Sequence, residues 1–242
     1  MTPLKLFCFS FAGGSAWNFR QLASHLRGHI EVVAIDLPGR GRRRNEPCID
    51  SWPELDAWLA AELRPQLREP YALLGYSFGA LVALSLAHRL TAEQETALPR
   101  PAALVACALR GPSAIEHAQL LHRLDDRPMF EALRDLGGIP DELLASPQLI
   151  ALSAPSMRAD LRLFETYASR GIPLDGIPVH SYCGRHDDSV GDGCMAWREE
   201  TNVSFHRRLF DGDHMFIQDH AAALADALVT DLLAGTLLRH AV

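Results

Sequence analysis

Apolar residues in this chain gather in short runs that alternate with segments of helical spacing. Four such runs in the first half have the length of buried strands: Leu4–Phe9, Glu31–Ile35, Tyr71–Leu74 and Ala102–Ala108. The segments between them carry apolar residues at helical spacing: Trp17–Leu26, a helix that begins at Ser51 with Glu54 completing a capping box, and 80–87. This alternation predicts a mostly parallel central sheet flanked by helices on both faces, which is an α/β fold.

The alternation stops between about residues 110 and 178. Four helical segments without a strand are expected there: Ala114–Arg123, Pro128–Leu136, Asp141–Ala145 and Pro147–Tyr167. Turn residues separate them, at Gly137-Gly138-Ile139-Pro140 and at Ser146-Pro147. The β/α rhythm then resumes, with strands Val179–Cys183 and Val203–Phe210, a short helix Met195–Thr201 and a closing helix Ala221–Leu238.

We therefore expect a core made of residues 1–110 and 178–242 and a helical insertion over residues 111–177. An insertion after a central strand of an α/β sheet is typical of a lid over a site at the sheet edge. A second small helical domain without a gating role is the alternative reading.

Composition and charge narrow the class of protein. The 242 residues are 48% hydrophobic and 22% charged, which fits one large globular domain, or one domain with an insertion. No apolar run approaches the ~20 residues that span a bilayer. The first apolar stretch lacks a basic leader, so we interpret it as a strand and expect no membrane partner. A formal net charge of −7 argues against nucleic acid as the main partner.

The cysteines point to a reducing compartment. The chain has five, an odd number, with no Cys-x-x-Cys pair, and three of them fall in predicted strands. Buried free cysteines in strands behave as small hydrophobic residues. The pattern therefore favours the cytoplasm over a disulfide framework.

Gly75-Tyr76-Ser77-Phe78-Gly79 carries the strongest chemical signal. It follows the strand Tyr71–Leu74 and precedes an apolar helical segment. A G-x-S-x-G motif in that setting predicts a nucleophile elbow, a sharp turn that holds the serine above the end of the sheet. The flanking glycines leave room for strand and helix to approach each other. We expect Ser77 to be a catalytic nucleophile.

A serine nucleophile needs a base, and the base needs an acid that orients it. In a fold of this kind the order along the chain is serine, acid, histidine, each on a loop after a strand. His214 follows the last predicted strand, and Asp187 follows the strand after the insertion, with Asp188 as the competing acid. We expect His214 to be the general base and Asp187 to orient it.

Two other readings of these loops stay open. His214 is read alternatively as a loop histidine satisfied by Asp211 or Asp213. The cluster of histidines and carboxylates also suggests a metal site, but the spacing matches no ligand motif. We therefore expect no metal and no cofactor.

Two backbone amides are candidates for an oxyanion hole, the pair of donors that stabilises a negatively charged oxygen. Phe78 N–H opens the helix after the elbow, where amides face outward. The second donor is expected from the loop after the first strand, which contains Gly13 and Gly14. Ala12 N–H is the candidate there, with Phe11 N–H as the alternative. The loop does not fit a phosphate-binding fingerprint.

Together these motifs resemble the type II thioesterases of the α/β-hydrolase superfamily, the stand-alone editing enzymes of polyketide and nonribosomal peptide synthetases. The resemblance covers nearly the whole chain and is carried by six segments: Phe7–Ala16, Asp36–Arg43, Gly75–Ala80, Leu124-Asp125-Asp126, Leu136–Pro140 and Arg158-Ala159-Asp160. Three positions depart from the family pattern. Ser10 and Ser189 stand where proline is usual, and Asp213 stands where glycine usually precedes the histidine.

The resemblance implies a substrate and a partner. The substrate is an acyl group in thioester linkage to the phosphopantetheine arm of an acyl or peptidyl carrier protein, and the implied biological role is the removal of stalled or wrongly loaded acyl units. A monomer is also implied. A carboxylesterase or lipase, a non-catalytic carrier-binding protein and an acyltransferase are the competing functions.

A basic cluster of Arg40, Arg42, Arg43 and Arg44 interrupts an otherwise acidic chain, and the first three are the candidates for docking. One interpretation is a docking patch for an acidic carrier protein or for the phosphate of its prosthetic arm. The other is a solvated loop that pairs with local carboxylates such as Asp36 and Glu46.

Overall fold

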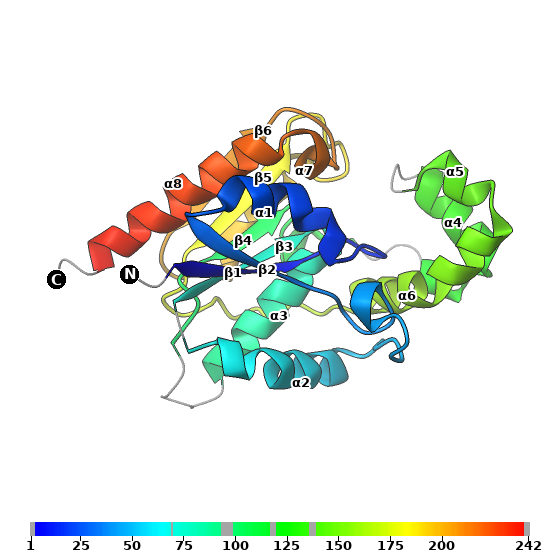
Figure 1. Cartoon of the computed structure of the whole chain (residues 1–242), viewed down its shortest axis with the longest axis horizontal. Coiled ribbons are helices and arrows are strands. Elements are labelled where there is room, and N and C mark those ends of the chain that lie inside the picture. Colours follow the sequence, from blue (N-terminus) through cyan, green and yellow to red (C-terminus); the bar gives the residue numbers. More distant parts are fainter. Residues whose placement is uncertain (1–2, 69, 93–98, 117–119, 136–138, 240–242) are drawn as a thin grey trace.

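The structure is a computed structural model that describes residues 3–68, 70–92, 99–116, 120–135 and 139–239. Its centre is a sheet of six parallel strands in the order β2-β1-β3-β4-β5-β6 (Figure 1). The strands are β1 Leu4–Phe9, β2 Ile30–Ile35, β3 Tyr71–Tyr76, β4 Leu104–Cys107, β5 Val179–Gly184 and β6 Phe205–Phe210. Since all six run the same way, the loops that leave their carboxyl ends meet at one edge of the sheet.

Helices cover both faces of the sheet. On one face, α2 (Trp52–Leu63) and α3 (Phe78–Ala92) pack on strand residues such as Phe7 and Leu73. On the other face, α1 (Arg20–Leu26) and α8 (Ala221–Arg239) pack on residues such as Leu74. Successive strand residues point to opposite faces of the sheet. Because helices cover both faces, the side chains on both sides of a central strand must be apolar. This explains why β3 reads as an unbroken apolar run, and it confirms the predicted α/β fold.

A shorter set of elements connects or closes the others. Most are single turns of 3₁₀ helix: η1 Ala16–Phe19, η2 Gly41–Arg43, η3 Arg64–Gln66, η4 Pro112–Ala114, η5 Leu121–Arg123 and the longer η6 Gly191–Glu200. One turn of α-helix, α7 Phe216–Asp219, precedes α8. In the part of the chain that the structure describes, none of the helices has the length and apolar character that crossing a membrane requires.

Two local predictions are wrong. Ser51 is the N-cap of α2, but its side chain makes no capping hydrogen bond, so the expected capping box does not form. The expected helix Ala114–Arg123 is not formed by the described residues of that segment, since Ala114 ends η4 and Leu121–Arg123 form η5, while residues 117–119 lie outside the described residues. Glu165 accepts a hydrogen bond from Leu121 N–H at 2.7 Å. Side-chain partners therefore replace the backbone partners that a helix would supply.

The insertion has a small apolar core of its own. Its helices are α4 (Asp126–Asp135), α5 (Asp141–Leu144) and α6 (Pro147–Glu165). Apolar side chains from all three, with Leu121, form a separate cluster. Figure 1 shows α4 and α5 to one side of the sheet, with α6 leading back toward it. Leu136, Gly137 and Gly138 lie outside the described residues. The division into core and lid remains a prediction.

Helix α6 makes polar contacts both within the insertion and with the core. Arg158 donates to the carbonyl oxygen of Leu124 at 2.6 Å and to the carboxylate of Asp126 at 2.6 Å. On the core side, Trp52 Nε1–H donates to the carbonyl oxygen of Leu163 at 2.8 Å. Two of the motifs recognised in the sequence, around Leu124 and around Arg158, are therefore in direct contact.

Candidate active site

The serine of the G-x-S-x-G motif lies in a strained turn between β3 and α3. Ser77 has a φ of +51°, which a non-glycine residue rarely adopts. Its N–H donates to the carbonyl oxygen of Cys107 on β4 at 2.8 Å, which ties the turn to the sheet. A Cβ on Gly79 would lie 2.2 Å from the carbonyl oxygen of Phe9. The turn therefore depends on the small neighbours of Ser77, and it leaves the serine partly exposed.

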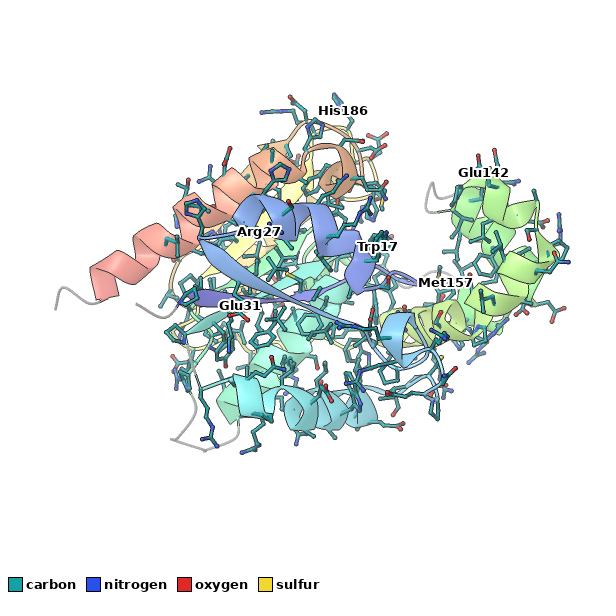
Figure 2. The ribbon with its side chains drawn as sticks, viewed as in Figure 1. Trp17, Arg27, Glu31, Glu142, Met157 and His186 are labelled. Carbon is teal, nitrogen blue, oxygen red and sulfur yellow. The ribbon has the colours of Figure 1, made fainter. Side chains whose placement is uncertain are left out.

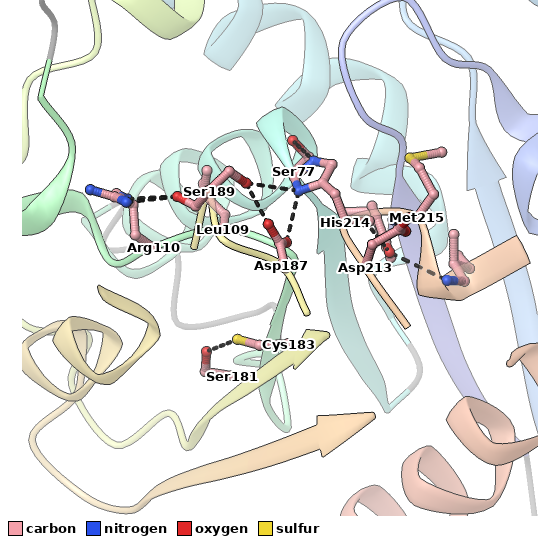
Figure 3. A network of polar contacts seen from close by, with 12 residues as sticks. Ser77, Leu109, Arg110, Ser181, Cys183, Asp187, Ser189, Asp213, His214 and Met215 are labelled. Carbon is pink, nitrogen blue, oxygen red and sulfur yellow. Dashed lines mark hydrogen bonds and ion pairs between the residues drawn. The ribbon is translucent and has the colours of Figure 1, made fainter. Parts of the chain in front are cut away.

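His214 contacts both of its predicted partners. Its Nε2 lies 3.1 Å from Ser77 Oγ, and its Nδ1 lies 2.8 Å from Asp187 Oδ2 (Figure 3). The three residues come from loops at the carboxyl ends of β3, β5 and β6. Of the two candidate acids, Asp187 is the one at the histidine, while Asp188 is exposed. One imidazole therefore joins a hydroxyl to a carboxylate.

The carboxylate is buried and well supplied with hydrogen bonds. The Asp187 side chain is 1% exposed, and Ser189 Oγ–H donates to its Oδ1 at 2.5 Å. Burial raises the pKa of Asp187, but the hydrogen bonds from His214 and Ser189 outweigh it and hold the pKa below its ordinary value. The acid is therefore ionised at neutral pH although it is buried.

Ser189 and Arg110 were not anticipated from the sequence. Ser189 Oγ lies 3.3 Å from His214 Nδ1 in addition to its bond with Asp187. Arg110 donates two hydrogen bonds to the carbonyl oxygen of Ser189, from Nε at 3.1 Å and from Nη2 at 2.7 Å (Figure 3). The sequence marked Ser189 only as a departure from proline, and no pattern linked it to Arg110, 79 positions earlier.

Tyr76, the residue before Ser77, forms hydrogen bonds with the loop that carries His214. Tyr76 Oη–H donates to the carbonyl oxygen of His214 at 2.7 Å and accepts a hydrogen bond from Ile217 N–H at 3.3 Å. Neighbouring loops are also joined, because His186 N–H donates to the carbonyl oxygen of Gly212 at 3.0 Å. The sequence placed Tyr76 at a variable position of the motif and gave no sign of this role.

The carboxylates proposed as alternative partners of His214 bind elsewhere. Asp213 accepts a hydrogen bond from Met215 N–H at 2.8 Å, and Asp211 pairs with Arg185 at 3.1 Å. Within the described ranges, no three histidine, cysteine, aspartate or glutamate side chains are grouped so that they could hold a metal ion.

Both amides proposed for an oxyanion hole are available as donors. Among the described residues, no protein group accepts a hydrogen bond from Ala12 N–H or Phe78 N–H. Phe11 N–H, the alternative to Ala12, is equally unengaged. The next amide along the loop is different, because Gly13 N–H donates to Asp160 Oδ2 at 2.8 Å.

The three arginines proposed for docking have different surroundings. Arg40 is 8% exposed and donates two hydrogen bonds to Asp160, so its inclusion in a surface patch is wrong. Arg43 lies over the Trp58 ring and binds two glutamates, Glu46 and Glu62. Arg42 has a side chain that is 86% exposed, with its Nε 3.8 Å from Asp36 Oδ2, so it makes one of the local pairings that the alternative reading expected and also faces solvent.

Comparisons with known proteins agree on one family. The model of the thioesterase domain matches residues 4–232. Thioesterase PikA5 of Streptomyces venezuelae is 32% identical over 234 residues, which cover 96% of this chain and 82% of that protein. Gramicidin S biosynthesis protein GrsT of Aneurinibacillus migulanus is 30% identical over 217 residues, covering 89% of this chain and 84% of that protein.

Solved structures give the same result. RedJ, a thioesterase from the prodiginine pathway of Streptomyces coelicolor, superposes with a TM-score of 0.85 at 34% identity, covering 95% of this chain and 86% of that one. The type II thioesterase BorB from the borrelidin biosynthetic cluster gives a TM-score of 0.84 at 31% identity, with 96% and 93% of the two chains covered.

Proposed function

This chain belongs to the thioesterase domain family, and from that premise we propose that it hydrolyses acyl thioesters through an acyl intermediate on Ser77. The observation that supports this best is the position of His214. One of its ring nitrogens lies 3.1 Å from Ser77 Oγ, and the other lies 2.8 Å from Asp187. A histidine held in this way has the geometry of a general base with a fixed tautomer.

In the first half of the reaction, Ser77 Oγ attacks the thioester carbonyl while its proton moves to His214 Nε2. Asp187 accepts a hydrogen bond from Nδ1–H and stabilises the imidazolium that forms. The carbon–sulfur bond then breaks, the proton on His214 Nε2 passes to the departing sulfur, and the thiol leaves with His214 neutral again. Because a thiolate is a good leaving group, this step needs little help from the acid form of His214. The product is an ester between the acyl group and Ser77.

In the second half, a water molecule attacks the acyl ester while His214 Nε2 takes its proton. The tetrahedral intermediate collapses, the proton passes to Ser77 Oγ, and the free acid departs. In both halves a negative charge develops on the former carbonyl oxygen. Ala12 N–H and Phe78 N–H, which have no protein acceptor among the described residues, are our candidates to stabilise it.

We further propose that the acyl group arrives on the phosphopantetheine arm of a carrier protein. The relatives belong to pathways of this kind: BorB is a type II thioesterase of the borrelidin cluster, and YbtT is one of the yersiniabactin pathway of nonribosomal peptide and polyketide synthesis. Removal of stalled or wrongly loaded acyl units is the role that fits such a partner. The exposed Arg42 offers a cation to an acidic carrier.

The cytoplasm is the compartment that we propose. All five cysteines are free thiols, and four of them are buried. Reduced thiols are usual in the cytosol, whereas disulfides form in oxidising compartments, so the free cysteines support this proposal.

A panel of acyl-loaded carrier proteins tests this function. Each carrier is incubated with the protein, and the loss of its acyl group is followed by intact-protein mass spectrometry. We expect release of free acid from at least one carrier, and faster turnover of small acyl thioesters than of matched oxygen esters. Better turnover of the oxygen esters would favour a carboxylesterase, and transfer of the acyl group to an added amine would favour an acyltransferase.

A further inference from the structure

The loop after β1 forms a tight turn that presents one of the proposed oxyanion donors. Gly14 N–H donates to the carbonyl oxygen of Phe11 at 2.9 Å, and Gly13 has a φ of +70°. This hydrogen bond and the positive φ at the third residue are the features of a type II turn. Ala12 occupies the second position. The orientation of the Ala12–Gly13 peptide therefore decides which turn forms.

That peptide is fixed by a carboxylate from the insertion. Asp160 on α6 is fully buried, and its Oδ2 accepts the hydrogen bond from Gly13 N–H at 2.8 Å. Met157, one turn earlier on α6, contacts the same residue: a Cβ on Gly13 would lie 2.6 Å from its Cε. Figure 2 shows Met157 where α6 reaches the core. The turn and the helix are thus joined by a polar and an apolar contact.

Arg40 holds the carboxylate in place. Its Nη1 donates to Oδ2 of Asp160 at 2.5 Å and its Nη2 to Oδ1 at 2.7 Å. Burial lowers the pKa of Arg40, but the charge of Asp160 and its hydrogen bonds raise it overall, so the guanidinium stays charged although it is buried. The buried Nε of Arg40 has no hydrogen-bond partner among the described residues. A buried ion pair that is not fully satisfied is weak evidence for a role in stability.

We propose that Asp160, held by Arg40, is a positioning residue for catalysis: it fixes the Phe11–Gly14 turn so that Ala12 N–H stays directed at the reacting carbonyl oxygen. Asp160 itself touches no reacting atom. Without an acceptor for Gly13 N–H, the Ala12–Gly13 peptide can rotate toward the other turn type, and the adjacent donor loses its fixed direction. The proposal rests on the proposed function, since it assigns a support to the same site.

Two double variants separate positioning from stability. Arg40→Met with Asp160→Leu replaces the ion pair by apolar side chains and leaves Gly13 N–H without an acceptor. Arg40→Met with Asp160→Asn also removes both charges, but its side-chain oxygen can still accept that hydrogen bond. Neither variant leaves a lone buried charge, which is the usual reason for such changes to unfold a protein. Turnover of a small acyl thioester and the Tm are measured for both.

We expect the leucine variant to lose about 10- to 100-fold in kcat with KM changed by less than about threefold, because a misdirected oxyanion donor affects the transition state more than substrate binding. The asparagine variant should recover most of kcat at a similar Tm. Affinity for an aldehyde analogue of the substrate, which forms a tetrahedral adduct on Ser77, should fall with kcat in the leucine variant.

Equal kcat in the two double variants would overturn the proposal. A loss of kcat in both variants that is proportional to their loss of Tm would also overturn it. The single change Asp160→Asn gives a second test, because it should keep kcat near that of the double asparagine variant even if Tm falls. Ser77→Ala is the separate control for the proposed function. If that variant keeps turnover, the acyl-serine mechanism fails, whatever the Asp160 variants do.

Discussion

At the scale of single residues, the acid loop explains how a buried carboxylate stays charged. Asp187 is removed from solvent, which alone would favour the neutral acid. Hydrogen bonds from His214 and Ser189 reverse that effect. Ser189 is in turn held by Arg110 through its carbonyl oxygen. The orientation of His214 thus depends on a short chain of contacts, of which the sequence indicated only the first.

The change Asp187→Asn tests the first contact. An amide in that place can donate where the carboxylate accepts, which favours the wrong tautomer of His214. We expect kcat for a small acyl thioester to fall by about 10³- to 10⁴-fold, as loss of the acid does in other serine hydrolases. The exposed neighbour provides the matched control: Asp188→Asn should change kcat by less than about twofold. The reverse order of the two effects would contradict the assignment of Asp187.

Stability should depend on Asp187 within a defined pH window. Its pKa in the folded protein is below the ordinary value of 3.8. Its contribution is therefore present above about pH 4 and is lost as the pH falls through the lower, folded value. Parent and Asp187→Asn should differ in free energy of unfolding by on the order of 1–2 kcal/mol near pH 7. Urea denaturation near pH 3 should give a smaller difference, and a constant difference would contradict this account.

At the scale of elements, the sequence predicted the strands well and the insertion less well. The central strands β3 and β4 are buried on both faces, so each leaves an unbroken apolar run, and β1 has the predicted bounds Leu4–Phe9. The helix predicted before α4 was wrong because Arg158 and Glu165, far along the chain, bind the backbone of that segment. The contact of Asp160 with Gly13, 147 positions apart, could not be read from any local pattern.

A substitution at Gly79, in the turn between β3 and α3, tests how tightly this turn packs against the sheet. Gly79→Ala would place a methyl group 2.2 Å from a backbone oxygen of β1. We expect a loss of about 3 kcal/mol or more in the free energy of unfolding, because backbone cannot easily move aside. Gly171→Ala is the comparison. Gly171 has a φ of +62° but nothing within 4 Å, so only backbone strain of about 1 kcal/mol is expected. Equal losses would contradict the close-packing argument.

At the scale of the whole molecule, parallel strands explain why residues 77, 187 and 214 meet. Each follows the carboxyl end of a strand, and β3, β5 and β6 lie in one sheet with only β4 between β3 and β5. The order of candidate residues along the chain therefore anticipated the arrangement. Surface properties were less predictable: of three neighbouring arginines, one is buried in an ion pair, one is bound by glutamates and one is exposed.

Arg42 tests the proposed encounter with a carrier protein. We expect Arg42→Glu to lower kcat/KM for a carrier-bound acyl group by about three- to tenfold, because charge complementarity acts on association. The kcat/KM for a small acyl thioester should stay unchanged. The loss should shrink at high salt. Arg100 precedes β4, at the opposite ends of the strands, and its side chain is 55% exposed. Arg100→Glu should leave kcat/KM unchanged for both substrates. Equal losses with both substrates would contradict docking at Arg42.

The most direct test of the account is to capture the acyl group on the enzyme. The protein is mixed with an acyl thioester, quenched in acid within milliseconds, and its mass is measured intact and after proteolysis. The account predicts a mass increase equal to one acyl group, located on the peptide that contains Ser77 and absent from Ser77→Ala. Hydrolysis that continues in Ser77→Ala, or an acyl group found on another residue such as the partly exposed Cys48, would contradict it.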